Sequence, residues 1–136
     1  MKKKLRERNG EFILSHALEL VVLSLLMVLF ISALGVVNQL MTVHSMAAEL
    51  SRYIEIRGQV DNAVHSELSR LERVSGIDVD CRISASYIRG TSKIQFGDEF
   101  TVTLSGQGQF GIGGLIRLGV PLRSTVAGRS EQYWKS

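Results

Sequence analysis

The feature that most constrains this chain is a long apolar run near its N-terminus. From Ala17 to Val37 there are 21 residues with a single charged side chain, Glu19. Because a helix rises about 1.5 Å per residue, a run of about 20 apolar residues can cross the hydrocarbon core of a bilayer. We therefore expect residues 11–37 to form a transmembrane helix that anchors the protein in the cell membrane by a single span.

The positive charge of the chain lies ahead of this run. Residues 1–11 contain five Lys or Arg and two acids, whereas residues 38–136 contain eleven Lys or Arg and ten acids. A basic excess on one side of a span keeps that side in the cytoplasm. We therefore expect residues 1–10 to be a cytoplasmic leader and the C-terminal part to be extracellular. Because no basic face recurs downstream, the sequence does not indicate a nucleic-acid partner.

A cleaved signal peptide is an alternative interpretation of the same run. Such a peptide needs about 7–15 apolar residues followed by a small-x-small site, and Ala33-Leu34-Gly35 provides one. The protein would then be a secreted small domain. Against this, the apolar character continues through Val36 and Val37 and passes into an amphipathic helix without a break signal.

Residues 38–76 have the period of a helical region with a break near residue 58. Apolar residues recur at spacings of three and four, which places them on one face of a helix. Gly58 is the expected break, Asp61 and Asn62 can cap a restart, and Gly76 is a suitable C-cap. The two apolar stripes are Leu40, Val43, Ala47, Leu50 and Ile54, then Val60, Val64, Leu68, Leu71 and Val74.

After Gly76 the period changes to two, which predicts antiparallel strands. A sheet of three or four short strands has little core of its own, so its apolar face should pack on the amphipathic helix. The predicted fold is α+β: a long transmembrane and amphipathic helix and a short second helix, packed against a small antiparallel β head over residues 77–136. The expected strands are 79–87, 94–96, 100–104 and 120–126, the last extended by Arg129–Trp134 beyond a bulge at Gly128.

Two details of these strands are specific enough to test. Phe100, Val102 and Leu104 alternate with polar residues and should face the helix. Pro121 lies near the start of the last main strand, and proline is confined largely to edge strands because it lacks an N–H.

The segment 106–119 contains six glycines in fourteen residues, and we expect it to be a flexible loop. Gly106, Gly108 and Gly111 form a literal G-x-G-x-x-G. A dinucleotide site needs that turn to open a helix inside a βαβ unit. Here Ile112 is followed by two more glycines, and too few residues remain for such a unit. We expect no cofactor and no small-molecule substrate, and a loop that folds onto the head or contacts a neighbour.

The sequence contains no recognisable catalytic or metal-binding set. His16, His44 and His65 lack metal-ligand spacing and should be solvated surface residues. Cys81 cannot form an internal disulfide; it fits a small apolar side chain in a strand, with an intermolecular thiol as the alternative. No Ser-His-Asp or Cys-His motif is present, so we do not expect an enzyme.

Two regions of the chain resemble known families. The basic leader, Gly10 and the long apolar helix resemble the class III signal of type IV pilin-like proteins. FGDEFTVTLS, the glycine-rich segment and VPLRSTVAGRSE resemble the head of TadE-like minor pseudopilins. KIQFGDEFTVTL and AGRSEQYWK are most similar to an uncharacterised family of small Firmicutes proteins, often carried on conjugative and mobile elements.

The pilin resemblance implies particular site residues. It implies a prepilin peptidase as a partner, which would cut between Gly10 and Glu11. In type IV pilins an acid five residues after the cut pairs with the new N-terminal amine of a neighbouring subunit. That position is Ser15 here, and Glu19 lies four residues further on the same helix face. Ser15 and Glu19 are therefore the candidate assembly residues, with Glu19 as a displaced pairing acid.

The sequence favours a structural role for this protein. Our first hypothesis is a pilin-like or pseudopilin subunit of a Gram-positive pilus, secretion or conjugation apparatus. Its partners would be the membrane and either its own copies or related pilin subunits, in a surface filament. The alternatives are a non-polymerising single-span component of a conjugative channel and the secreted domain described above.

Overall fold

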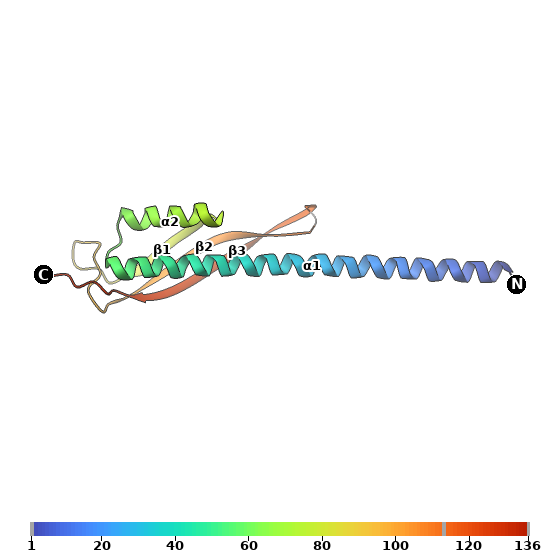
Figure 1. Cartoon of the computed structure of the whole chain (residues 1–136), viewed down its shortest axis with the longest axis horizontal. Coiled ribbons are helices and arrows are strands. Elements are labelled where there is room, and N and C mark those ends of the chain that lie inside the picture. The colour runs from blue at the N-terminus through green and yellow to red at the C-terminus, as the bar shows by residue number, and fades with distance from the viewer. Residues whose placement is uncertain (1, 113, 136) are drawn as a thin grey trace.

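A computed structural model describes residues 2–112 and 114–135, with side chains from residue 8 onward. It contains a helix of 56 residues, α1 (Lys2–Arg57), and a shorter helix, α2 (Asn62–Ser75). Three strands follow, β1 (Val79–Ala85), β2 (Glu99–Ile112) and β3 (Ile116–Arg129). The sheet and α2 lie beside the C-terminal half of α1, and the N-terminal half projects away from them (Figure 1). The predicted α+β class is confirmed.

The helix boundaries follow the signals in the sequence. Helix α1 ends at Arg57 because Gly58 adopts a positive φ of 63°, which glycine tolerates better than other residues. Helix α2 begins after Asp61, whose side chain accepts a hydrogen bond from the Ala63 N–H at 3.0 Å. Helix α2 ends at Gly76, a left-handed C-cap with its N–H bonded to the Glu72 carbonyl. Gly58, Asp61 and Gly76 are confirmed as boundary residues, whereas Asn62, the other candidate cap, is the first residue of α2.

The three strands form one antiparallel sheet in the order β1-β2-β3. Strand β1 pairs with the first half of β2, from Ala85 opposite Phe100 to Val79 opposite Gly106. Strand β3 pairs with β2 along its whole length, from Arg129 opposite Glu99 to Ile116 opposite Ile112. Strand β3 is an edge strand, as Pro121 predicts, and the second half of β2 extends beyond β1.

The core lies between this sheet and the C-terminal half of α1. Phe100, Val102 and Leu104 of β2 are buried, as predicted from their alternation. From the helices, the buried apolar residues of the predicted stripes are Val43, Ala47, Leu50 and Ile54 of α1 and Val64 and Leu71 of α2. Two members of the predicted stripes are wrong: Leu40 is 42 % exposed and Val74 is 77 % exposed. Leu40 lies between the half-buried Gln39 and the buried Val43, and Val74 follows the buried Leu71, so both project from the uncovered side of their helix.

Two predicted strand segments are also wrong. Of residues 94–96 only Ile94 makes a β-bridge, with Tyr87, and the preceding Lys93 makes another with Gln59. Beyond Arg129 the chain leaves the sheet, and Gly128 pairs regularly with Phe100 instead of forming a bulge. The departing chain is held by other partners, because Ser130 N–H bonds the Asp98 carbonyl at 3.0 Å and Glu131 N–H bonds the Glu55 carbonyl at 3.0 Å.

The predicted flexible loop at 106–119 is wrong as well. Apart from the turn around Gly114, this segment forms the outer half of a β2–β3 hairpin. Gly106, Gly108 and Gly111 lie within β2 and do not open a helix. Every residue pair from Gly106–Leu122 to Ile112–Ile116 is in register. Strand pairing, with support from α1 described below, outweighs the low strand propensity of glycine.

Gly128 marks the closest approach of β3 to α1. A Cβ atom at this position would lie 2.5 Å from Phe100 Cζ and 2.5 Å from Ser51 Oγ, both in the core layer. The buried Ser51 on α1 and the glycine on β3 thus allow the helix and strand backbones to pack closely. A larger side chain at either position would separate them.

We expect Gly128→Ala to destabilise the protein by about 1–3 kcal/mol, because an extra methyl must displace Phe100 or the helix. Gly119→Ala on the same strand is the matched control, since its Cβ would meet only the flexible end of Gln107, at 2.9 Å. The measurement is urea unfolding of the full chain in detergent micelles, followed by Trp134 fluorescence. Equal midpoints for the two variants would show that Gly128 is not a packing constraint.

Candidate membrane and assembly surface

Residues 8–28 of α1 are exposed and have no packing partner within the described chain. Between Phe12 and Val37 the large apolar side chains are exposed except for Leu29 and Val36, which are half-buried, and most are more than half exposed. The helix is long and apolar enough to cross a membrane, judged by length and composition. We call residues 12–37 the bare segment of α1. It is the largest exposed apolar surface of the molecule, and it is continuous with the helix that carries the core.

The predicted processing and assembly residues lie at the start of this segment. Gly10, Glu11 and Ser15 are exposed on α1, and a Cβ at Gly10 would meet no atom within 4 Å. The Glu19 side chain is 75 % exposed, and its Oε2 lies 3.3 Å from Nδ1 of His16. The His16 ring packs edge-on against Phe12. The structure thus gives Glu19 a partner on its own helix, which the sequence reasoning had not identified, and the roles of all four residues stay predictions.

The outer half of the hairpin packs along one face of α1 toward the bare segment (Figure 1). Leu29, Ser32, Val36 and Gln39 are half-buried at spacings of three and four, which define a single helix face. Gly108 permits this approach, because a Cβ there would lie 2.6 Å from Gln39 Oε1. The hairpin therefore covers α1 well beyond the core, as far as the apolar run.

Two polar side chains on this face bond the free edge of β2. The Gln109 N–H donates to Gln39 Oε1 at 3.0 Å, and Gln39 Nε2 donates to the Gln109 carbonyl at 3.4 Å. Two helical turns closer to the N-terminus of α1, the Ser32 hydroxyl donates to the Gly111 carbonyl. Because β1 ends opposite Gly106, these backbone groups have no strand partner on that side. In the sequence, the only sign of this contact is the spacing of Ser32 and Gln39, which are seven residues, or two helical turns, apart and so lie on one face of α1.

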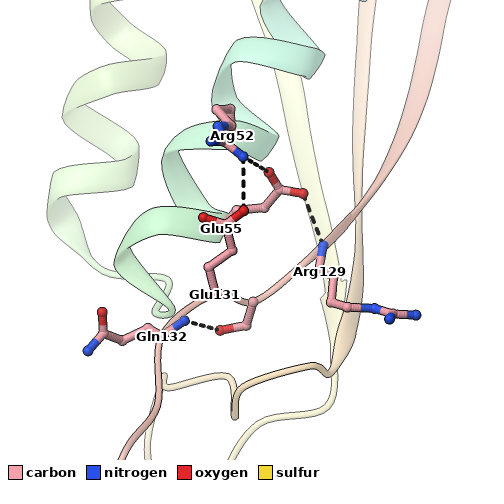
Figure 2. Close-up of polar contacts among 6 residues, drawn as sticks. Arg52, Glu55, Arg129, Glu131 and Gln132 are labelled. Atoms are coloured by element: carbon pink, nitrogen blue, oxygen red, sulfur yellow. Dashed lines mark hydrogen bonds and ion pairs between the residues drawn. The ribbon is translucent and has the colours of Figure 1, made fainter.

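At the opposite end of the head, a carboxylate on α1 fastens the end of the sheet (Figure 2). Glu55 Oε1 accepts a hydrogen bond from the Arg129 N–H at 3.1 Å, and Oε2 lies 3.3 Å from the Arg52 guanidinium. Arg52 also reaches Glu131 at 3.0 Å. The Glu55 side chain is only 20 % exposed, whereas Arg52 and Glu131 are more than half exposed. Glu55 is therefore the best-packed residue of this group, and Arg52 and Glu131 lie at the surface around it.

The ionisable groups of the head serve its structure. Burial raises the pKa of the half-buried Cys81 thiol, with a smaller contribution from the nearby acids Asp80 and Glu72, so the thiolate is disfavoured. His44 Nδ1 lies 2.9 Å from the hydroxyl of the buried Ser124, so this histidine is tied to β3 and is not purely solvated as expected. Within the described residues, no group of three or more His, Cys, Asp or Glu is placed to hold a metal ion.

We expect Glu55→Ala to destabilise the protein by about 1–2 kcal/mol, because it removes a charged acceptor from the Arg129 N–H. Glu99→Ala is the control: Glu99 pairs with the side chain of the same Arg129 at 2.8 Å, but both side chains are more than 60 % exposed. Such a surface pair contributes about 0.5 kcal/mol or less. Urea-unfolding midpoints of the two full-length variants test this, and a larger loss from Glu99→Ala would contradict it.

Comparison with known proteins gives a family but no activity. No curated protein and no solved structure matches the chain. One family model matches residues 20–135. This range includes most of the bare segment, the C-terminal half of α1, all of α2 and the whole sheet. The chain therefore belongs to the DUF4320 family, whose domain is one of unknown function.

Proposed function

We propose that this protein is a membrane-anchored structural subunit of pilin-like design, whose head lies outside the cell and whose bare segment packs against neighbouring helices. One observation carries the proposal. Helix α1 is unbroken over 56 residues, and it is apolar and mostly exposed along the bare segment but contributes to the core in its C-terminal part. An anchor and a head that share one helix move as a rigid unit, which suits a subunit that must be stacked in a fixed orientation.

The physical chemistry of the bare segment supports this. Apolar side chains on every face of a helix need lipid or other helices around them. In lipid, helices associate by close packing and polar contacts instead of by burial from water. Glu19 is an ionisable side chain within this segment, and such a residue is by default a functional one. A basic group of an adjacent subunit is a suitable partner for it.

The apparatus is suggested by resemblance. Two stretches are similar to small Firmicutes proteins of mobile elements. KIQFGDEFTVTL forms the turn before β2 and the first part of β2, and AGRSEQYWK forms the end of β3 and the C-terminal chain. Together with the basic leader they support a place in a Gram-positive pilus, secretion or conjugation apparatus.

A second candidate function is a single-span component that does not polymerise. The contact between Glu19 and His16 favours it, because a carboxylate with a partner on its own helix does not require a neighbouring subunit. Ser15, at the position where type IV pilins have the pairing acid, favours it too. The two candidates differ in what removal of Glu19 should do.

We expect the N-terminus to be cytoplasmic and the head external, because the basic excess precedes the span. In a Cys81→Ser background, Lys135→Cys should react with an impermeant thiol reagent in intact cells. Lys3→Cys should react only after the cells are permeabilised. The reverse pattern would show that the head faces the cytoplasm.

For a filament subunit, Glu19→Leu should insert into the membrane normally but form little sheared surface polymer. Its loss leaves a basic group of the adjacent subunit uncompensated between packed helices, at a cost of about 3–5 kcal/mol. Glu19→Asp should retain part of the assembly. For a plain anchor, Glu19→Leu should insert at least as well as the parent and function normally, because a charge near lipid is unfavourable.

The mass of the mature chain is measured on the same samples. Loss of residues 1–10 supports processing after Gly10, an intact chain supports the plain anchor, and a cut near Gly35 supports secretion. Normal polymer from the Glu19→Leu variant would remove Glu19 from the assembly surface and leave its apolar neighbours as the determinants.

A further inference from the structure

We propose that the tip of the β2–β3 hairpin, residues 110–112 and 114–118, is a second membrane contact that lies in the outer headgroup region of the bilayer, with phospholipid as its partner. This inference rests on the proposed anchoring by α1. It adds a lipid-binding site on the head, at a segment of the chain far from the span in sequence.

The position of the tip along α1 is the first argument. The Ser32 hydroxyl bonds the Gly111 carbonyl, so Gly111 lies level with Ser32. Ile112 and residues 114–116, which follow Gly111 toward the turn, continue past that level toward the N-terminal end of α1 (Figure 1). Ser32 belongs to the apolar run of Ala17–Val37. The hairpin thus extends alongside helix that the bilayer must cover.

The length of the span gives the second argument. A hydrocarbon core of about 30 Å takes about 20 helical residues. If the core begins directly after Glu11, it ends near Ser32, level with Gly111. If it begins after Glu19, it ends near Gln39, and the tip would lie deeper still. Whether the hydrocarbon core begins after Glu11 or after Glu19, the tip lies at the outer boundary of the core or within it.

The side chains of the tip suit the boundary region. Leu115 is 92 % exposed, and Ile116 and Leu118 are more than half exposed, although β-turn residues facing water are usually polar. Arg117 stands among them and is also exposed. Apolar side chains that reach the acyl boundary, with a basic residue at the level of the phosphates, are typical of interfacial membrane contacts.

The backbone of the tip fits the same place. Exposed strand edges are not tolerated in hydrocarbon, because their N–H and C=O groups lack partners there. Along α1, Gln39 and Ser32 satisfy Gln109 and Gly111 on the free edge of β2. The Leu115 N–H bonds the Ile112 carbonyl at 3.0 Å within the turn. Within the described residues, no α1 side chain is hydrogen-bonded to the backbone of β3 at residues 116–118, which favours the hydrated headgroup region over the hydrocarbon core.

Fluorescence quenching in proteoliposomes tests the proposal on the full chain. Single cysteines in a Cys81→Ser background carry an environment-sensitive fluorophore, in vesicles of phosphatidylcholine and phosphatidylglycerol with nitroxide-labelled lipids. The positions are Leu115→Cys at the tip, Ser92→Cys in an exposed loop at the far end of the head, and Leu25→Cys in the span. Because Leu115 and Ser92 are both exposed, neither change should disturb folding.

We expect the Leu115→Cys probe to be blue-shifted and quenched several-fold more by nitroxides near the headgroup than the Ser92→Cys probe. Adding Arg117→Gln should weaken that quenching in the anionic vesicles. A tip probe that behaves like the Ser92→Cys probe overturns the proposal. So does a blue shift without lipid quenching that disappears when the protein is diluted in lipid, because the tip would then contact a second copy. Failure of the Leu25→Cys probe to be quenched would instead overturn the proposed anchoring.

Discussion

The structure depends on one interaction, the packing of a three-stranded sheet on the C-terminal half of α1. Three strands cannot enclose a core by themselves, and in the described chain the apolar stripe of α1 is covered by the sheet and α2. Val43, Ala47, Leu50 and Ile54 therefore supply one wall of the core, and Phe100, Val102 and Leu104 supply the other. Since the same helix continues into the bare segment, the head and the predicted span share one continuous element.

This dependence explains why small and polar residues occur where α1 meets the sheet. Gly128 and Ser51 bring β3 close to the helix at one end, and Gly108 brings β2 close to Gln39 at the other. Close approach brings strand edges and chain ends against the helix, and their polar groups then need partners. Glu55 meets that need at the distal end and Gln39 and Ser32 at the membrane end. The apolar stripe holds the sheet against the helix, and these polar contacts fix the position of the sheet along the helix.

Most of the fold could be predicted from sequence because its signals are local. A stripe at helical spacing, a capping Asp61 and two glycines at the helix ends each act within a few residues, and all were confirmed except for Leu40 and Val74 in the stripes. The glycine-rich segment was missed because its strand structure comes from partners distant in the chain. Gly108 looks like a loop residue until α1 lies beside it, and Gln39 looks like a surface residue until the free edge of β2 reaches it. The C-terminal chain was mispredicted for the same reason, since Glu131 pairs with the backbone of Glu55 and not with a strand.

The candidate site was less accessible to sequence reasoning than the fold. Gly10, Glu11, Ser15 and Glu19 came from resemblance, and the structure adds only the Glu19–His16 contact to them. The extension of the hairpin toward the span required coordinates, because residues 32 and 111 are remote in sequence. Yet the apolar character of Leu115, Ile116 and Leu118 was visible in the sequence, and it is anomalous for a loop in water.

The two membrane contacts together would determine how the head is presented. A single straight helix fixes the height of a head above the bilayer but leaves it free to rotate about the helix axis. A hairpin tip bound at the surface removes that rotation, because it sits to one side of the axis and is joined rigidly to α1 through Gln39 and Ser32. All copies in one membrane would then share the same tilt and differ only in their direction within the plane. Neighbouring subunits would meet with their heads at matching heights and angles, which lowers the orientational cost of lateral assembly. The hairpin would thus contribute to assembly even if it contacts no other subunit.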